Sequence, residues 1–246
     1  MQEGTFLSVV IPAYNEAGRI VSTLQRVTQY LSAQSYTWEV LVVDDGSTDQ
    51  TAALVEEHIR RHNGFRLLRV SHGGKGWAVK NGMLAAGGQY RFMADADLAM
   101  PIEQLPKFLP PGVADCDIVI GSREGEGAVR IGEPVLRRFL GRAYKVLIRL
   151  LLVPGLRDTQ CGFKCYKGQV AQELFSLQRI PGWGFDMEVL FLARKFRRSI
   201  CEVGVEWHYQ SQSKVKPFRD SLKMLVEIMR VRWYSLHGVY RLARGR

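Results

Sequence analysis

The first 120 residues alternate short apolar runs with helix-like stretches, and no other feature of the sequence restricts the fold as strongly. The runs are rich in β-branched residues and have the length of buried strands. They lie at 6–11, 38–43, 65–70, 90–94 and 117–120. The stretch after the first run repeats apolar residues at helical spacing from Ile20 to Leu31. Right-handed crossovers between such strands predict an α/β fold with a mainly parallel, doubly wound sheet flanked by helices.

Polar or glycine-bearing loops follow the early strands. They contain Tyr14-Asn15-Glu16, Asp44-Asp45, the glycine-rich stretch 73–76, and Asp95 with Asp97. In doubly wound sheets, ligands bind beyond the carboxyl ends of the strands. We therefore expect these loops to converge on one crevice.

The second half of the chain is less regular. We expect a basic amphipathic helix at about 134–152, a helix at 184–197, a strand at 200–207, a polar segment at 208–217 and a last helix at about 218–240. This division predicts one main domain over 1–217, followed by a basic amphipathic helical segment over 218–246.

The formal net charge of +10 implies an anionic partner. The positive excess is local, because it lies in 134–152 and in 214–246. A nucleic-acid-binding module is one interpretation of such a balance. Against it, the aromatic residues do not interleave with basic ones in a DNA- or RNA-binding pattern, and the two acidic pairs would repel phosphate unless a metal ion is bound. We therefore expect no nucleic-acid partner.

The cysteines and the N-terminal residues bear on the compartment. Four cysteines in 246 residues do not make a disulfide framework, and we expect reduced, buried thiols. The first residues lack the basic and apolar regions of a secretory signal, and no window holds about 18 uninterrupted apolar residues. These observations favour a cytoplasmic protein without a membrane span.

The motif Asp95-Ala96-Asp97 at the end of the fourth expected strand is the strongest chemical signal. Two carboxylates one residue apart on a turn can both face a divalent cation, and hard oxygen ligands suit Mg²⁺ or Mn²⁺. Such a cation would bridge diphosphate oxygens and neutralise charge on a leaving nucleotide. An acidic, solvated loop is the alternative. The strand-end position after a βαβαβ run favours the metal site.

Residues at the first two strand ends suggest a nucleoside site. Asp44 and Asp45 lie directly at the second strand terminus, where a base or a ribose hydroxyl could be held. A helix-capping turn is the alternative interpretation. At the first strand end, Pro12, Tyr14 and Glu16 could clamp base and ribose, although a lone tyrosine is more often simple packing.

Taken together, these segments resemble the signature of family 2 glycosyltransferases with the nucleotide-sugar-binding, Rossmann-like GT-A fold. The resemblance covers roughly residues 6–220 and rests on five motifs in order: Val10-Ile11-Pro12-Ala13-Tyr14-Asn15-Glu16, Val43-Asp44-Asp45-Gly46-Ser47-Thr48-Asp49, Asp95-Ala96-Asp97-Leu98, Gly121-Ser122-Arg123 and Asp158-Thr159-Gln160-Cys161-Gly162-Phe163-Lys164. The last two motifs are similar to the branch of dolichyl-phosphate β-glucosyltransferases and polyprenyl-phosphate glycosyltransferases.

The resemblance implies a role for each matching residue. The implied nucleotide-sugar-binding residues are Pro12, Tyr14, Glu16, Asp44, Asp45, Lys75, Asp95 and Asp97, of which Asp95 and Asp97 also hold the metal. The implied catalytic residues are Asp97, Arg123 and Asp158, and the implied acceptor-phosphate residues are Arg123, Arg137, Arg138 and Lys214. Gln160, Asp186 and Glu188 are candidates for the sugar pocket. One departure is Ala99, where dolichyl-phosphate mannose synthases usually carry a metal-binding glutamine.

The resemblance also implies a reaction: a metal-dependent, inverting transfer of a hexose, with glucose from UDP-glucose expected, onto a polyprenyl or dolichyl phosphate. A phosphate monoester is already largely ionised at neutral pH, because its second pKa is about 6. Such an acceptor needs alignment and cations more than a general base. The alternatives are a mannosyltransferase using GDP-mannose, which Ala99 disfavours, and transfer to a glycan hydroxyl, which the basic acceptor residues oppose.

Two basic amphipathic segments suggest a membrane surface. In 134–152, one helical stripe is cationic and leucines fill much of the rest, a pattern that can lie in a bilayer interface. The last expected helix has the same character. A core-packed helix with a solvated basic edge is the alternative for both. We expect peripheral attachment to the cytoplasmic face of an anionic membrane.

Overall fold

The structure, a computed structural model, describes residues 4–133, 153–210 and 217–241. The expected basic helix at 134–152 lies outside the described residues, and so do the acceptor candidates Arg137, Arg138 and Lys214.

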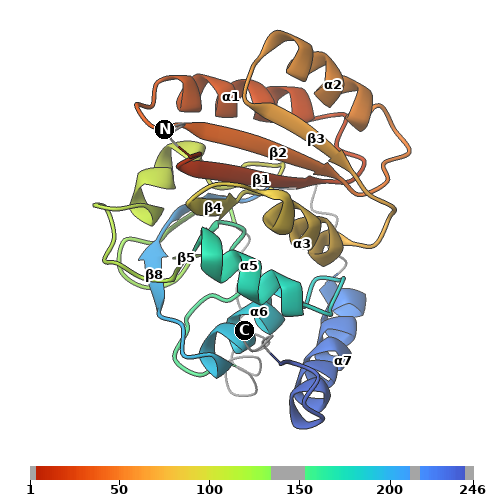
Figure 1. Ribbon diagram of the computed structural model, residues 1–246, viewed down its shortest axis with the longest axis vertical. Helices are drawn as coiled ribbons and strands as arrows, with labels where there is room; N and C mark the ends of the chain where they lie inside the picture. The colour runs from red at the N-terminus through yellow and green to blue at the C-terminus, as the bar shows by residue number, and fades with distance from the viewer. Residues whose placement is uncertain (1–3, 134–152, 211–216, 242–246) are drawn as a thin grey trace.

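A seven-stranded sheet forms the centre of the molecule (Figure 1). Its strands are β1 (Leu7–Ala13), β2 (Trp38–Asp44), β3 (Phe65–Arg69), β4 (Tyr90–Met93), β5 (Ile118–Ser122), β7 (Lys164–Lys167) and β8 (Ile200–Gly204). They lie in the order β3-β2-β1-β4-β7-β5-β8. All run parallel except β7, which is antiparallel to both neighbours. The expected mainly parallel, doubly wound sheet is confirmed.

Helices cover both faces of this sheet (Figure 1). One face carries α1 (Ile20–Ser32), α2 (Thr51–Arg61) and the 3-10 helix η1 (Ile102–Phe108), and the other carries α3 (Lys75–Ala85), α5 (Gly168–Leu177) and α6 (Phe185–Lys195). Along β1, Leu7 and Val9 join the core under α1, whereas Val10 joins the core under α3. Because successive strand side chains point to opposite faces, an apolar strand builds both cores at once.

The last helix, α7 (Pro217–Leu236), lies beside α6. Its inner residues Met224, Ile228 and Val231 are buried and belong to the core that α3, α5 and α6 share. The expected C-terminal segment therefore packs on the main body over its described part. No helix within the described ranges has the length and apolar character required to cross a bilayer.

Strand β1 extends further than the sequence suggested. It continues through Pro12 to Ala13 instead of stopping at the proline. On the β4 side, pairing covers only Leu7 to Val10, so β4 needs no backbone N–H from Pro12. The proline therefore sits in the strand without breaking the sheet.

The expected strand at 200–207 is two strands. β8 ends at Gly204, and β9 (Glu206–His208) pairs with β6 (Val129–Ile131) in a separate two-stranded sheet. The chain therefore leaves the central sheet after Gly204, and this brings the ring of Trp207 to 5.6 Å from the guanidinium of Arg123, the residue that follows β5.

Two cysteines contradict the expectation of four reduced thiols. Cys116 and Cys201 form a disulfide, although 85 residues separate them in the sequence. They lie beside each other because β5 and β8 are neighbouring strands. The order of the strands in the sheet brings the two cysteines together, and their spacing in the sequence does not indicate the pairing. Cys161 and Cys165 are free and buried, as expected.

Candidate active site

The loop after β2 is organised by Asp45. Its carboxylate accepts hydrogen bonds from the backbone N–H groups of Gly73 and Gly74, each at 2.9 Å, and lies 2.9 Å from Nδ1 of His72. Gly74 has a φ of +104°, a conformation that favours glycine. Asp45 thus shapes the glycine-rich loop that opens α3. Its neighbour Asp44 is buried and accepts the N–H of Ser47 at 3.3 Å.

An aromatic wall stands at the end of β1. The ring of Tyr14 stacks on His72 with centroids 4.2 Å apart and an interplanar angle of 24°. His72 was not among the residues chosen from the sequence. Glu16, on the same loop, pairs with Arg19 at 2.7 Å, and its N–H donates to Thr51 Oγ1 at 2.7 Å. These contacts fix the loop after β1 against the loop after β3 and against the start of α2.

At the end of β4, Asp95 and Asp97 are half-buried. The N–H of Ala99 donates to Asp97 Oδ1 at 3.0 Å. Burial, together with the charge of Asp95, raises the pKa of Asp97 above its ordinary value. The two negative carboxylates repel each other in this partly buried site, and a cation bound to both would relieve the repulsion.

Lys75, the first residue of α3, reaches this pair. Its Nζ lies 2.6 Å from Asp95 Oδ1. Burial opposes the ammonium charge, but Asp95, Asp186 and Asp97 outweigh it and raise the pKa of Lys75. The ring of Trp183 lies 5.1 Å from the same Nζ. Trp183 is partly exposed in the turn before α6, and no local pattern in the sequence singled it out.

The 158–164 motif lies directly against Asp95. A Cβ on Gly162 would stand 2.1 Å from Asp95 Oδ2, so only glycine allows this approach. Two residues on, Lys164 is fully buried, and its Nζ lies 2.7 Å from Asp186 Oδ1 and 2.5 Å from the carbonyl of Cys161. Burial raises the pKa of Asp186 although Lys164 opposes the shift. Asp186 is thereby brought to the same site as Lys75.

Arg123 and Asp158 form a bidentate pair near the end of β5. Arg123 Nε lies 2.6 Å from Asp158 Oδ2, and its Nη2 lies 2.8 Å from Oδ1. The guanidinium also faces the ring of Trp207. Although burial opposes the charge, Asp158 raises the pKa of Arg123 beyond its ordinary value. Asp158 is buried, so it positions Arg123 while the partly exposed guanidinium can meet an anion.

The remaining sugar-pocket candidates lie in different surroundings. Gln160 donates its side-chain N–H to the sulfur of Met224 at 3.7 Å. Glu188 accepts the N–H groups of Arg179 and Ile180 and the hydroxyl of Tyr240, the last at 2.5 Å. These contacts give Glu188 a structural part in joining α6 to the end of the chain.

The donor set fits a hard divalent cation. Asp95 and Asp97 supply carboxylate oxygens, and Lys75 already holds positive charge against Asp95. Among the described residues, no three or more histidine, cysteine, aspartate or glutamate side chains gather as a metal cluster. Two carboxylates leave coordination positions for phosphate oxygens of a ligand, which is how Mg²⁺ commonly binds beside phosphates.

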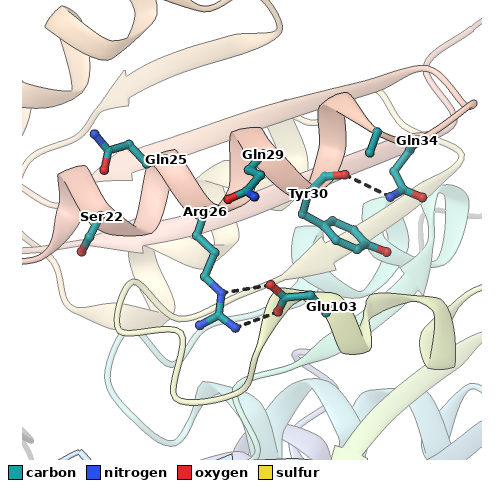
Figure 2. A pocket seen from close by; sticks show the side chains of 8 residues that line it. Ser22, Gln25, Arg26, Gln29, Tyr30, Gln34 and Glu103 are labelled. Atoms are coloured by element: carbon teal, nitrogen blue, oxygen red, sulfur yellow. Dashed lines mark hydrogen bonds and ion pairs between the residues drawn. The ribbon is translucent and has the colours of Figure 1, made fainter.

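A separate groove of about 560 Å³ runs along the outer side of α1 (Figure 2). Ser22, Gln25 and Gln29 line it, and Arg26 Nη2 lies 2.9 Å from Glu103 Oε2 across it. None of the strand-end residues lines this groove. Its lining comes from α1, the turn after α1 and η1, so the groove lies apart from the strand-end residues.

Residues 8–175 match the model of Glycosyl transferase family 2. The match spans the loops of Tyr14, Asp45 and Asp95 and the Arg123–Asp158 pair. The chain belongs to glycosyltransferase family 2. The resemblance of the five motifs and the GT-A fold expectation are thereby confirmed, and the chain is a glycosyltransferase.

The sequence similarity to relatives extends over nearly the whole of this glycosyltransferase. It is 35% identical to a dolichyl-phosphate β-glucosyltransferase of Dictyostelium discoideum, over 98% of this chain and 78% of the relative. It is 33% identical to the Homo sapiens protein of that name, over 98% of this chain and 79% of the relative.

Among solved structures, the fold resembles that of glucosyl-3-phosphoglycerate synthase from Mycobacterium tuberculosis in complex with Mn²⁺, UDP-glucose and phosphoglyceric acid. The TM-score is 0.65 at 20% identity, over 92% of this chain and 79% of that chain. At 20% identity, this similarity shows that the two proteins share a fold.

Proposed function

We propose that this glycosyltransferase moves glucose from UDP-glucose to a polyprenyl phosphate of the dolichyl type, with Mg²⁺ or Mn²⁺ as cofactor. The observation that carries the proposal is the near full-length similarity, at 33–35% identity, to proteins named dolichyl-phosphate β-glucosyltransferase. The described residues agree with it, because they include a carboxylate pair suited to a metal-bound diphosphate and an oriented arginine suited to a phosphate acceptor.

The donor half of the proposed site comes from the ends of β1, β2 and β4. Tyr14, with His72 stacked on it, offers an aromatic face to a base. Asp95 and Asp97 would hold the cation, which supplies charge neutralisation for the diphosphate leaving group. Pro12, Glu16 and Asp44 remain candidates for the nucleoside, while Asp45 acts through the loop that it orders.

The acceptor half centres on Arg123. Its guanidinium is fixed by Asp158 and by Trp207, so the planar fork is oriented before an anion arrives. A phosphate oxygen is already ionised and attacks without a general base. Arg123 would align it, and in-line displacement from an α-linked donor would give the β product. Arg137, Arg138 and Lys214 remain predictions for the same phosphate.

We also propose peripheral attachment to the cytoplasmic face of a membrane, and the exposed side of α7 supports the attachment itself. Val226, Met229, Trp233 and Leu236 recur at helical spacing and are 49%, 60%, 53% and 84% exposed. Lys223 and Arg230 are exposed on the same helix. An apolar stripe beside cations is the pattern of a helix that lies in an anionic bilayer surface.

Vesicle sedimentation tests this membrane position. Replacing both Met229 and Trp233 by serine is expected to lower the bound fraction on phosphatidylserine-containing vesicles, because it removes apolar area that would enter the bilayer. Val21→Ser, an exposed apolar residue on α1, serves as the control. Equal binding of all three proteins would exclude α7 as the membrane contact.

Transfer itself is tested with labelled UDP-glucose, Mg²⁺ or Mn²⁺ and a short polyprenyl phosphate, followed by organic extraction. Label is expected in the organic phase, and GDP-mannose in place of UDP-glucose is expected to give little. Asp97→Ala is expected to abolish the transfer while leaving the protein folded. Transfer from GDP-mannose alone, or full activity of Asp97→Ala, would overturn the assignment.

A further inference from the structure

Lys75 occupies one of the two carboxylates that a divalent cation would need. Its Nζ lies 2.6 Å from Asp95 Oδ1, a direct ion pair within the proposed metal site. The side chains are 16% and 27% exposed, so solvent screens this pair less than one on the open surface. An ammonium group at that distance competes with a metal ion for Oδ1.

The second oxygen of Asp95 is crowded on one side by the backbone of Gly162. Oδ2 faces the backbone of Gly162 so closely that a Cβ there would stand 2.1 Å away, and 2.7 Å from the carboxylate carbon. The carboxylate is therefore held between Lys75 and Gly162. A cation that approaches Oδ1 therefore competes with the ammonium group for the same carboxylate.

The charges behind this pair favour an ammonium group in the site. Lys164 is fully buried and pairs with Asp186 at 2.7 Å. The negative charge of Asp186 also stabilises the Lys75 ammonium group, as do the charges of Asp95 and Asp97. Three carboxylates and two ammonium groups leave a single net negative charge in this cluster. A divalent cation arriving alone would be repelled by two ammonium groups and attracted by only one net negative charge. A nucleoside diphosphate brings further negative charge to the cluster.

We propose that Lys75 is an internal counter-cation that withholds Asp95 from the divalent metal until a nucleoside diphosphate enters and draws the ammonium group onto its phosphates. The inference rests on the proposed function for the identity of the donor. It makes metal binding conditional on the nucleotide, so that Lys75 sets the order in which the donor site fills. Asp186 and the Trp183 ring flank the ammonium group and keep it in the site after it leaves Asp95.

The experiment measures Mn²⁺ binding without any transfer reaction. Free Mn²⁺ is followed by electron paramagnetic resonance while the protein is titrated, first alone and then with saturating UDP. For the unaltered protein, UDP is expected to tighten Mn²⁺ binding by about tenfold or more. For Lys75→Met, binding without UDP is expected to tighten by roughly tenfold, since a like charge a few ångströms away is removed. The gain from UDP should shrink accordingly.

Two variants separate the charge from other effects of the substitution. Lys75→Arg keeps a cation and is expected to leave Mn²⁺ binding without UDP weak. Lys195→Met removes the same net charge at the far end of α6, where its Nζ bonds Ser235 Oγ, and is expected to change neither affinity. Thermal unfolding of each variant is measured to check that the fold is retained.

The outcomes distinguish this inference from the proposed function. Equal Mn²⁺ affinity of Lys75→Met and the unaltered protein without UDP would overturn the counter-cation role while leaving the donor site intact. The counter-cation role also fails if UDP leaves the Mn²⁺ affinity of the unaltered protein unchanged. Absence of Mn²⁺ binding even with UDP would overturn the proposed donor site and the inference together. Failure of transfer with normal Mn²⁺ and UDP binding would contradict the acceptor assignment alone.

Discussion

Gly162→Ala tests the placement of Asp95 more sharply than a change of the carboxylate itself. The substitution adds one methyl group, which would stand 2.1 Å from Asp95 Oδ2, 2.7 Å from its carboxylate carbon and 3.2 Å from Met100 Cε. Favourable contacts between heavy atoms lie at about 3.5–4.0 Å. The carboxylate must therefore move by about 1 Å or more, or the backbone of the 158–164 motif must give way.

The size of the expected effect follows from that displacement. A misplacement of about 1 Å at a reacting centre costs about 100-fold in rate. Expressed as transition-state stabilisation, this is about 2.7 kcal/mol. Overpacking of the fold would add a loss of about 1–3 kcal/mol in the free energy of unfolding. We therefore expect a folded but less stable protein whose kcat/KM for UDP-glucose falls by about two orders of magnitude.

The assay compares kcat/KM from labelled glucose transfer with the thermal unfolding midpoint of the same preparation. Gly87→Ala is the matched control, because a Cβ there meets only Glu39 Oε1, at an ordinary 3.6 Å. The control is expected to keep both values. A Gly162→Ala protein that is folded and fully active would show that the position of Asp95 does not govern donor turnover.

Further predictions concern buried groups. Asp158→Ala is expected to lower the free energy of unfolding by about 3–5 kcal/mol in urea titration, because it leaves Arg123 without its carboxylate; an unchanged midpoint would contradict this pairing. Glu188→Gln is expected to cost about 1–3 kcal/mol, since an amide cannot accept every N–H and O–H that the carboxylate accepts; a neutral result would remove its structural role. Burial raises the pKa of Cys161 to about 11 and that of Cys165 still higher. Both thiols are thus protonated at pH 8 and should react with a maleimide only after unfolding; rapid labelling of the native protein would be inconsistent with their burial.

The parallel half of the sheet could be predicted because each of its strands is an apolar run of ordinary length. The short strand β7 could not, since its four residues begin and end with lysine. Lys164 is tolerated at a fully buried position only because Asp186, from helix α6, neutralises it. Such a pairing depends on the tertiary fold and leaves no local pattern in the sequence.

In the site, too, some residues could be predicted from the sequence and others depend on the tertiary fold. Asp95, Asp97 and the strand-end loops follow from topology, because parallel strands end at one edge of the sheet. His72 and Trp183 do not, since each acts through a ring contact with a residue from another loop. The disulfide between Cys116 and Cys201 likewise depends on the adjacency of β5 and β8. The nucleoside role of Asp45 stays a prediction, and the contact that the structure shows is with the glycine-rich loop, whose N–H groups its carboxylate accepts.

The anomalous signal of manganese, in crystals of the protein grown with UDP and Mn²⁺, would locate the cation and the diphosphate at once. We predict one manganese peak in contact with the Asp97 carboxylate and with diphosphate oxygens, and Lys75 Nζ displaced from Asp95. A complex in which UDP is bound with its diphosphate away from the end of β4, and no manganese touches Asp95 or Asp97, would rule out a metal-bound donor at this carboxylate pair.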